Sequence, residues 1–333
     1  MKAIVWTQYG SAEGLQLQEI EKPSPKNDEI LVKIVATSVT AGDSEMRRLK
    51  LPLMLSWPMR LYAGVIRPRR LTVLGQELAG VVEEVGKDVQ VFKKGNQVFG
   101  TTGLGFGAYA EYICLKGSPN EVQGVLAIKP ANLSYEEAAV VPTAAFEALH
   151  FLRAANVQPR QKVLVFGAGG SIGTFSVQLA KHFGAEVTAV DSTNKLEMLR
   201  KLGADETIDY TKQDVTQNGE SYDVIIDVVG SRLVSSRLKS LKQNGRYCLA
   251  NASLSHLFLR LWLSITSQKK LLIQAADQTS ANLRYLTELI EAGKLVPTVD
   301  RSYSLEQIPD AHRYADTGQK LGNIAITISG DDE

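Results

Sequence analysis

The hydrophobic pattern changes near residue 130. Before it, short β-rich runs alternate with turn residues, which is typical of a compact β-rich domain. The predicted strands are Glu29–Val35, Leu78–Val85, Val91–Phe99 and Gly107–Leu115.

After residue 130 the pattern alternates between helices and apolar strands. A Ser134–Glu137 capping box starts a helix that continues through Thr143–Leu152. Near-continuous apolar strands separated by helices predict an α/β fold with a doubly wound parallel sheet. The predicted strands are Lys162–Phe166, Glu186–Val190, Val224–Val229, Tyr247–Ala250 and Leu271–Ala276, and the helices between them include Lys195–Leu202 and Arg232–Leu241. Helices from Leu283 and Leu305 and a strand at Asn323–Ile328 follow.

A glycine-rich turn joins two of these strands. The segment Val163–Asp191 reads as strand, turn, helix, strand and then an acid 18 residues beyond Gly173. Counted from Ala168 the turn has the form A-x-G-x-x-G, a variant of the dinucleotide-binding pattern. Glycines let a backbone approach a pyrophosphate, and the first N–H groups of a helix can donate to it. The candidate cofactor residues are Gly167, Gly169, Gly170, Ser171, Ile172 and Gly173. The alternative is a tight βα turn in a fold that binds something else.

The residues after the second strand leave the choice of dinucleotide open. Asp191 would accept from ribose hydroxyls and repel a 2′-phosphate, which favours NADH. Ser192 and Lys195 follow directly and could bind a 2′-phosphate, which favours NADPH. A solvated position on a helix is the alternative for Lys195.

Composition narrows the class of protein. The chain has 333 residues, enough for two domains, and a net charge of +1, which does not suggest a nucleic-acid partner. Its two cysteines, Cys114 and Cys248, do not form a disulfide framework. The opening residues lack the pattern of a signal peptide and no apolar run is long enough for a membrane span, so we expect a cytoplasmic protein.

Several ordered segments resemble the medium-chain dehydrogenase/reductase superfamily, in its zinc-free quinone oxidoreductase-like branch. They are Asp28–Asp43, Gly75–Gly86, Gly107–Tyr112, Leu133–Leu149, Val163–Asp191, Gly203–Tyr210, Tyr222–Gly230 and Gly293–Ala311. The resemblance implies a GroES-like catalytic domain at 1–130, a Rossmann domain at 131–280 and a return to the first domain at 281–333. It also implies a homodimer and an active site in the cleft between the domains.

The departures from the zinc-dependent members indicate the chemistry. Thr40 and Gln76 stand where those members have a cysteine and a histidine, and neither residue type is a good zinc ligand, so we expect no metal. Without a Lewis acid, conjugated acceptors are easier to reduce, because a quinone or enone spreads the charge that the hydride brings. The resemblance therefore implies hydride transfer from NADPH or NADH to quinones or α,β-unsaturated carbonyl compounds.

The candidate catalytic residues are Thr40, Asp43 and Gln76, with Thr40 or Gln76 donating to the substrate oxygen and Asp43 ordering the cluster. A polar network that only holds the fold together is the alternative. The resemblance also places Thr143 and Asn323 near the nicotinamide and Tyr210 on the adenosine side. Two other functions stay open: an alcohol or aldehyde dehydrogenase of the same fold, and a non-catalytic dinucleotide-binding protein with a membrane or protein partner.

Two further segments combine apolar and basic residues, Met46–Arg70 and Leu254–Leu263. Such segments can bind membranes or partners. A substrate-entrance lid for the first, and a dimer-interface or cleft helix for the second, are the favoured interpretations.

Overall fold

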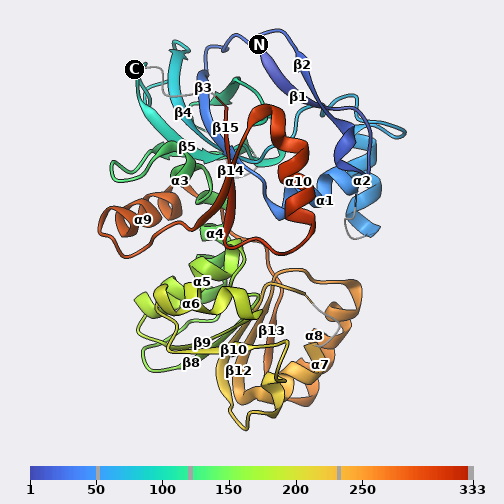
Figure 1. Ribbon diagram of the computed structural model, residues 1–333, viewed down its shortest axis with the longest axis vertical. Helices are drawn as coiled ribbons and strands as arrows, with labels where there is room; N and C mark the ends of the chain where they lie inside the picture. The colour runs from blue at the N-terminus through green and yellow to red at the C-terminus, as the bar shows by residue number, and fades with distance from the viewer. Residues whose placement is uncertain (50–52, 119–122, 231–233, 329–333) are drawn as a thin grey trace. The chain divides into compact units, whose positions relative to one another are not determined.

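The computed structural model describes residues 1–49, 53–118, 123–230 and 234–328, with the backbone alone at 53–56. The chain divides into two compact units (Figure 1). The first comprises Met1–Thr143, Gln278–Ala292 and Pro297–Glu333, and the second comprises Ala144–Asp277 and Gly293–Val296. The domain boundaries expected at residues 130 and 280 stay predictions.

The first unit is built on β-structure. Within the described residues, β1 (Lys2–Trp6) and β2 (Leu15–Glu19) form an antiparallel pair, and a seven-stranded sheet has the order β14-β15-β3-β4-β5-β7 with β6 on β3. The strands of the larger sheet are β3 (Glu29–Ser38), β4 (Glu77–Val85), β5 (Gln97–Thr101), β6 (Tyr112–Lys116), β7 (Val125–Ile128), β14 (Val299–Ser304) and β15 (Asn323–Thr327).

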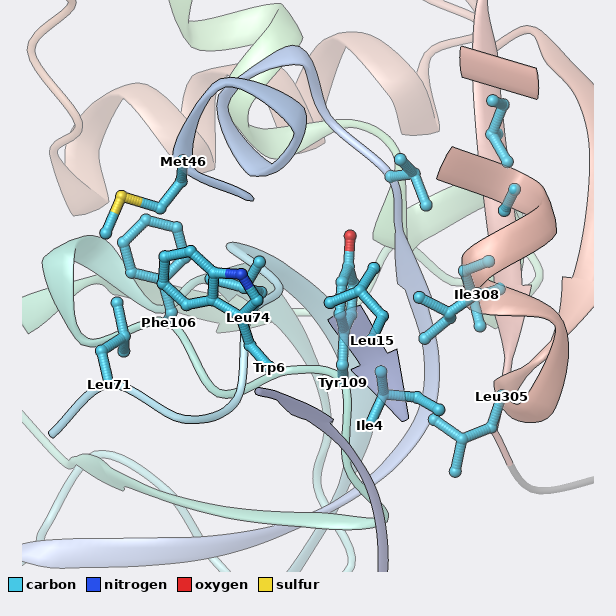
Figure 2. Packing of buried hydrophobic residues seen from close by; sticks show 14 of the residues in the cluster. Ile4, Trp6, Leu15, Met46, Leu71, Leu74, Phe106, Tyr109, Leu305 and Ile308 are labelled. Carbon is cyan, nitrogen blue, oxygen red and sulfur yellow. The ribbon is translucent and has the colours of Figure 1, made fainter. Parts of the chain in front are cut away.

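Some helices of the first unit pack around an apolar cluster that contains Trp6, Leu74 and Phe106 (Figure 2). The α1 helix contributes Met46 to this cluster and α10 contributes Ile308. The helices are α1 (Ala41–Arg48), α2 (Leu53–Ala63), α3 (Tyr135–Ala139), α9 (Ser280–Glu291) and α10 (Ile308–Asp316), with 3₁₀ turns η1 (Ala12–Gly14), η2 (Gly103–Gly105) and η7 (Leu305–Gln307).

The second unit is a doubly wound α/β structure. Its described strands form a six-stranded parallel sheet in the order β10-β9-β8-β11-β12-β13, so the chain reverses its direction of travel between β8 and β11. Ligands of such sheets bind at the carboxyl ends of the strands beside this reversal. The predicted fold class is confirmed. The strands are β8 (Lys162–Phe166), β9 (Glu186–Asp191), β10 (Glu206–Asp209), β11 (Tyr222–Asp227), β12 (Leu241–Leu249) and β13 (Lys270–Leu272).

The helices of the second unit are α5 (Ser171–His182), α6 (Leu196–Lys201), α7 (Val234–Arg237) and α8 (Leu254–Thr266), with 3₁₀ turns η4 (Thr193–Lys195), η5 (Val215–Gln217) and η6 (Leu238–Ser240). The helix α4 (Pro142–Ala154) carries the boundary between the units.

Some predicted elements were wrong. The strand expected at Val91–Phe99 begins only at Gln97, because Lys93 and Asn96 close a turn in front of it. The Ser134–Glu137 capping box is confirmed, but α3 ends at Ala139 and α4 starts afresh at Pro142, whose fixed φ suits a first helical position. The helix expected at Arg232–Leu241 is only α7, followed by η6 and then β12, and its first two residues lie outside the described part.

The structure describes only part of the first apolar and basic segment, Met46–Arg70, and all of the second, Leu254–Leu263. In Met46–Arg70, residues 50–52 and the side chains of 53–56 lie outside the described part. The segment Leu254–Leu263 forms most of α8, which packs through Leu259 and Leu263 and exposes an opposite apolar stripe. No helix in the described ranges is both long and apolar enough to cross a bilayer. The stripe consists of Leu254, Leu257, Phe258, Leu261, Trp262 and Ile265.

Candidate functional site

The glycine-rich turn connects β8 to α5 with no room for side chains at two positions. Gly167 has φ of +73°, in the region that favours glycine. A Cβ on Gly173 would lie 2.3 Å from the Gly167 carbonyl oxygen, so the turn and the helix approach each other closely only because residue 173 is glycine. Gly170 is the N-cap of α5, so the backbone of Ser171 and Ile172 forms the first turn, at the helix end that favours a negatively charged ligand.

Asp191 ends β9 and braces this turn. Its Oδ2 accepts from the Gly169 N–H at 2.8 Å, and its Oδ1 accepts from the Ser192 N–H at 2.8 Å. The Lys195 ammonium lies 3.5 Å from Oδ1. Both charged side chains are buried, with Lys195 only 6% exposed, so the interpretation of Lys195 as a solvated helix residue is wrong. Burial occurs because Lys195 ends the 3₁₀ turn η4 and its stem packs on Gly169, where a Cβ would lie 2.5 Å from Lys195 Cδ.

Tyr210 follows β10, directly beside Asp191. Its N–H donates to the Asp191 carbonyl at 3.2 Å, while its side chain is 62% exposed. The neighbouring Asp209 accepts from the hydroxyls of Thr193 and Thr211, and these hydrogen bonds hold the pKa of its carboxyl far below the usual range. Ser192, Tyr210 and the Asp191–Lys195 pair are therefore brought together at one edge of the sheet.

A second acid, Asp227, holds the loop that follows β11, the strand beside β8 in the sheet. It was not among the candidates from the sequence. Asp227 ends β11 and is fully buried. It accepts from the N–H groups of Val229 and Gly230, from Arg237 at 2.5 Å and from the Tyr247 hydroxyl at 2.6 Å. Burial beside Asp227 raises the pKa of Tyr247. The acid thereby fixes the loop that follows β11.

The three candidate catalytic residues meet in the first unit. Thr40 is the N-cap of α1 and forms a capping box with Asp43. Asp43 Oδ2 accepts from the Thr40 hydroxyl at 2.6 Å and from the Thr40 N–H at 3.0 Å, and its Oδ1 accepts from the Gly75 N–H at 3.1 Å. The Gln76 Oε1 lies 3.4 Å from the Thr40 hydroxyl. Burial raises the pKa of Asp43 to about 6, against the effect of these hydrogen bonds.

Glu77 adds a second buried carboxyl to this cluster. It accepts from the Ser38 hydroxyl and from the Thr143 N–H at 2.5 Å, in the first turn of α4, where a helix favours an acid. Burial, with Asp43 nearby, raises the pKa of Glu77 to about 7. Its place directly after Gln76 was a usable signal in the sequence. Tyr109 is fully buried nearby, where burial and the charge of Asp43 raise its pKa, and its hydroxyl lies 3.1 Å from Nε2 of His312.

Of the two residues expected near the nicotinamide, Thr143 lies against Glu77 as described. Asn323 begins β15 and is buried, and its Nδ2 donates to the Thr298 carbonyl at 3.1 Å. Both residues belong to the first unit.

The donor set at Thr40 does not fit zinc. The hydroxyl of Thr40 and the amide of Gln76 are poor zinc ligands, and the oxygens of Asp43 are taken up by hydrogen bonds from Thr40 and Gly75. Among the described residues, no three His, Cys, Asp or Glu side chains gather as a metal site.

Comparison with known proteins agrees with this architecture. Residues 26–127 match the alcohol dehydrogenase GroES-like domain, and residues 202–326 match the zinc-binding dehydrogenase domain. The chain is 33% identical over 338 residues to a 2-methylene-furan-3-one reductase of Solanum lycopersicum, covering 98% of this chain and 79% of the relative. It is 30% identical, with the same coverage, to an NADPH-dependent alkenal/one oxidoreductase of Arabidopsis thaliana. The quinone oxidoreductase of Coxiella burnetii has a similar structure, with a TM-score of 0.87, 26% identity and 99% of each chain covered.

The fold and these relatives define an NAD(P)H-dependent oxidoreductase with a GroES-like β-rich domain and a Rossmann sheet. The chain belongs to the medium-chain dehydrogenase/reductase superfamily, in the branch of quinone oxidoreductases and alkenal reductases.

Proposed function

We propose that this protein reduces quinones and α,β-unsaturated carbonyl compounds with NADPH, without a metal ion. The observation that carries the proposal is the hydrogen-bonded cluster of Thr40, Asp43 and Gln76, which offers polar hydrogens where a Lewis acid would otherwise be needed. The relatives named as alkenal and furanone reductases support the substrate class.

The second unit supplies the dinucleotide site. The backbone of Gly167, Gly169, Gly170 and Gly173 leaves room for a pyrophosphate, and the N–H groups of Ser171 and Ile172 donate to it. When bound, the dinucleotide supplies a hydride from its reduced nicotinamide. We assign Thr143 and Asn323 to the nicotinamide end and Tyr210, whose ring is exposed, to the adenosine end.

Asp191 decides between the two dinucleotides. Both of its oxygens already accept backbone N–H groups, and Lys195 neutralises its charge, so it is a poor acceptor for ribose hydroxyls and a weak repellent of phosphate. Lys195 and Ser192 stand beside it as partners for a 2′-phosphate. This arrangement favours NADPH over NADH.

The first unit polarises the substrate oxygen. Hydride addition to a conjugated carbonyl places negative charge on that oxygen, and donors aimed at it lower the barrier. While Asp43 is ionised, the Thr40 hydroxyl donates to it at 2.6 Å. Once protonated, Asp43 donates to Thr40, and the Thr40 hydrogen is released toward the substrate oxygen. Water supplies the proton that completes the reduction, so activity is expected to fall as pH rises through about 6, where Asp43 ionises.

The test is oxidation of NADPH and NADH, side by side, with quinones, enones and simple aldehydes after chelator treatment. We expect metal-free turnover of quinones or enones and a preference for NADPH. Thr40→Val should lower kcat with little change in dinucleotide affinity, whereas Gly173→Ala should abolish that affinity. Turnover of simple aldehydes alone, or activity restored only by zinc, would contradict the proposal. Cytoplasmic location and a homodimer stay predictions.

A further inference from the structure

The helix α8 turns an apolar face toward solvent. Leu259 and Leu263 pack its opposite face against the core of the second unit, beside β13 (Figure 1). The residues of the apolar stripe follow one another at alternating spacings of three and one, which places them on one side of the helix. Each of their side chains is between 46% and 77% exposed. Single exposed apolar residues are ordinary, but a continuous patch of this kind marks an interaction surface.

A basic cavity borders the stripe. It encloses about 610 Å³, and its walls come from α8, β12, β13 and the loop between α8 and β13. On α8, Arg260 and Ser264 are one turn apart and follow the stripe residues Leu257 and Leu261 by three positions each, so they lie along one edge of the stripe. The basic residues that line the cavity are Arg246, Arg260, Lys269 and Lys270.

The cations of this basic cavity lack acidic partners among the described residues. Residues 241–276 contain no Asp or Glu, although the whole chain is nearly neutral at +1. Lys242, outside the cavity, pairs with Asp223 at 2.9 Å, whereas none of the four cavity cations makes an ion pair in the described part of the chain. Lys269 is held in place because its ammonium donates to the Leu238 carbonyl at 2.7 Å. The cavity is therefore suited to negatively charged groups such as phosphates.

We infer that α8 and the basic cavity form a docking surface for a membrane that contains anionic phospholipids. The apolar stripe enters the boundary between headgroups and acyl chains, while the cavity cations bind headgroup phosphates. Trp262 lies within the stripe, and tryptophan is a residue type that favours this boundary. With 13 residues, α8 is too short to cross a bilayer, so it lies along the membrane surface. The inference concerns binding alone and does not rest on the proposed reaction.

A second copy of the chain fits this surface less well. A twofold contact uses the same patch on both partners, so it brings the four cations close to their own copies. Residues 241–276 supply no acid to offset them, and like charges across an interface weaken it. An anionic bilayer, in contrast, matches both the apolar stripe and the cations beside it.

Sedimentation with vesicles tests the choice of partner. The full-length protein is mixed with vesicles of phosphatidylcholine alone, or of equal parts phosphatidylcholine and phosphatidylglycerol. We expect binding to the mixed vesicles at low salt, much weaker binding to the neutral vesicles, and loss of most binding in molar salt, which screens the charges. Equal binding to both kinds of vesicle, or no binding to the mixed ones, would overturn the inference.

The fluorescence of Trp262 tests whether α8 makes the contact. The chain has three tryptophans, all in the described ranges, and Trp6 is fully buried, so Trp57→Phe leaves Trp262 as the exposed indole. In this variant, mixed vesicles should shift the emission to the blue, and phospholipids brominated on their acyl chains should quench it. Sedimentation with the vesicles but no quenching would show that another surface binds, and the inference would be wrong.

Substitutions separate the two parts of the surface. Arg260→Gln and Lys270→Gln should each weaken binding to the mixed vesicles roughly fivefold, since each removes one cation near an anionic surface. Leu261→Ser should weaken it roughly tenfold, because the bilayer no longer buries that side chain. All three residues are exposed, so the Tm should stay close to that of the native protein.

The matched controls make the same changes elsewhere on the surface. Lys201→Gln removes a cation of α6 that pairs with Glu197, and Leu17→Ser removes an exposed leucine of β2. Neither should change vesicle binding, and losses equal to those of the α8 variants would overturn the inference. Analytical ultracentrifugation covers the remaining outcome. If Leu261→Ser splits a native dimer into monomers and leaves vesicle binding unchanged, the face is an interface between copies and the inference is wrong.

Discussion

The ammonium of Lys195 lies 3.5 Å from the carboxylate of Asp191, and both side chains are buried at the carboxyl end of β9. A 2′-phosphate can therefore be met by a cation that is already in place. The pair also holds the glycine turn, because Asp191 accepts from the Gly169 N–H. Under the proposed function, selectivity for the dinucleotide would therefore depend on the same two residues that shape its turn.

Lys195→Ala should raise the KM for NADPH by roughly 10- to 100-fold and change the KM for NADH much less, because it removes one charge-assisted hydrogen bond to phosphate. Steady-state kinetics with both dinucleotides measure the ratio. Lys195→Arg is the matched control, which keeps the charge and should keep most of the preference. Equal losses for NADPH and NADH in Lys195→Ala would assign the lysine to the fold instead.

Two glycines of the turn should respond differently to the same small change. An added Cβ at Gly173 meets the Gly167 oxygen at 2.3 Å, whereas at Gly170 it meets that oxygen at 3.5 Å. Gly173→Ala should lose dinucleotide binding and about 1–3 kcal/mol of stability, and Gly170→Ala should retain the stability. Calorimetric titration with NADPH and thermal unfolding test the pair. Retained binding in Gly173→Ala would refute this geometry.

Glu77 should make the protein less stable as pH rises. Because burial raises its pKa from 4.5 to about 7, the native state holds a proton that the unfolded chain releases. The resulting stability is fully present below pH 4.5 and is lost as pH rises through 7, an effect on the order of 3 kcal/mol. Glu77→Gln should therefore gain stability relative to the native protein between pH 5 and pH 8, measured by urea unfolding. A difference independent of pH would show that Glu77 does not titrate in this range.

Removing one partner of the buried Asp227 carboxylate should lower the free energy of unfolding. Arg237→Met leaves a fully buried carboxylate without its cation and should cost about 3–5 kcal/mol. Tyr247→Phe removes a single donor and should cost about 1–3 kcal/mol. Calorimetric unfolding measures the loss of stability in both variants. A larger loss in Tyr247→Phe than in Arg237→Met would mean that the ion pair contributes little to stability.

Local signals in the sequence were sufficient for the glycine turn and for the capping box of Ser134, because each depends on residues within a few positions. The cluster around Asp43 was predicted only in part. Thr40 and Gln76 were found because they replace expected ligands, while Glu77, whose carboxyl accepts from Ser38 and Thr143, depends on contacts between distant segments.

Burial of polar residues was the other source of error. Lys195 sits in a polar stretch, DSTNK, which suggests solvent, but the 3₁₀ turn η4 directs its stem across Gly169. The strand expected from Val91 failed for a similar reason, since a turn around Lys93 and Asn96 outweighed the β propensity of the apolar residues.

The position of β15 has a consequence for how the protein is made. This late strand pairs with Ala36–Ser38 at the end of β3, near the start of the chain, so during translation this part of β3 lacks its partner while the whole of Ala144–Asp277 leaves the ribosome. An open edge of that kind can pair with other chains. Pairing of this edge with other chains can therefore compete with correct folding until β15 emerges. The helix that carries His312 emerges only shortly before that strand.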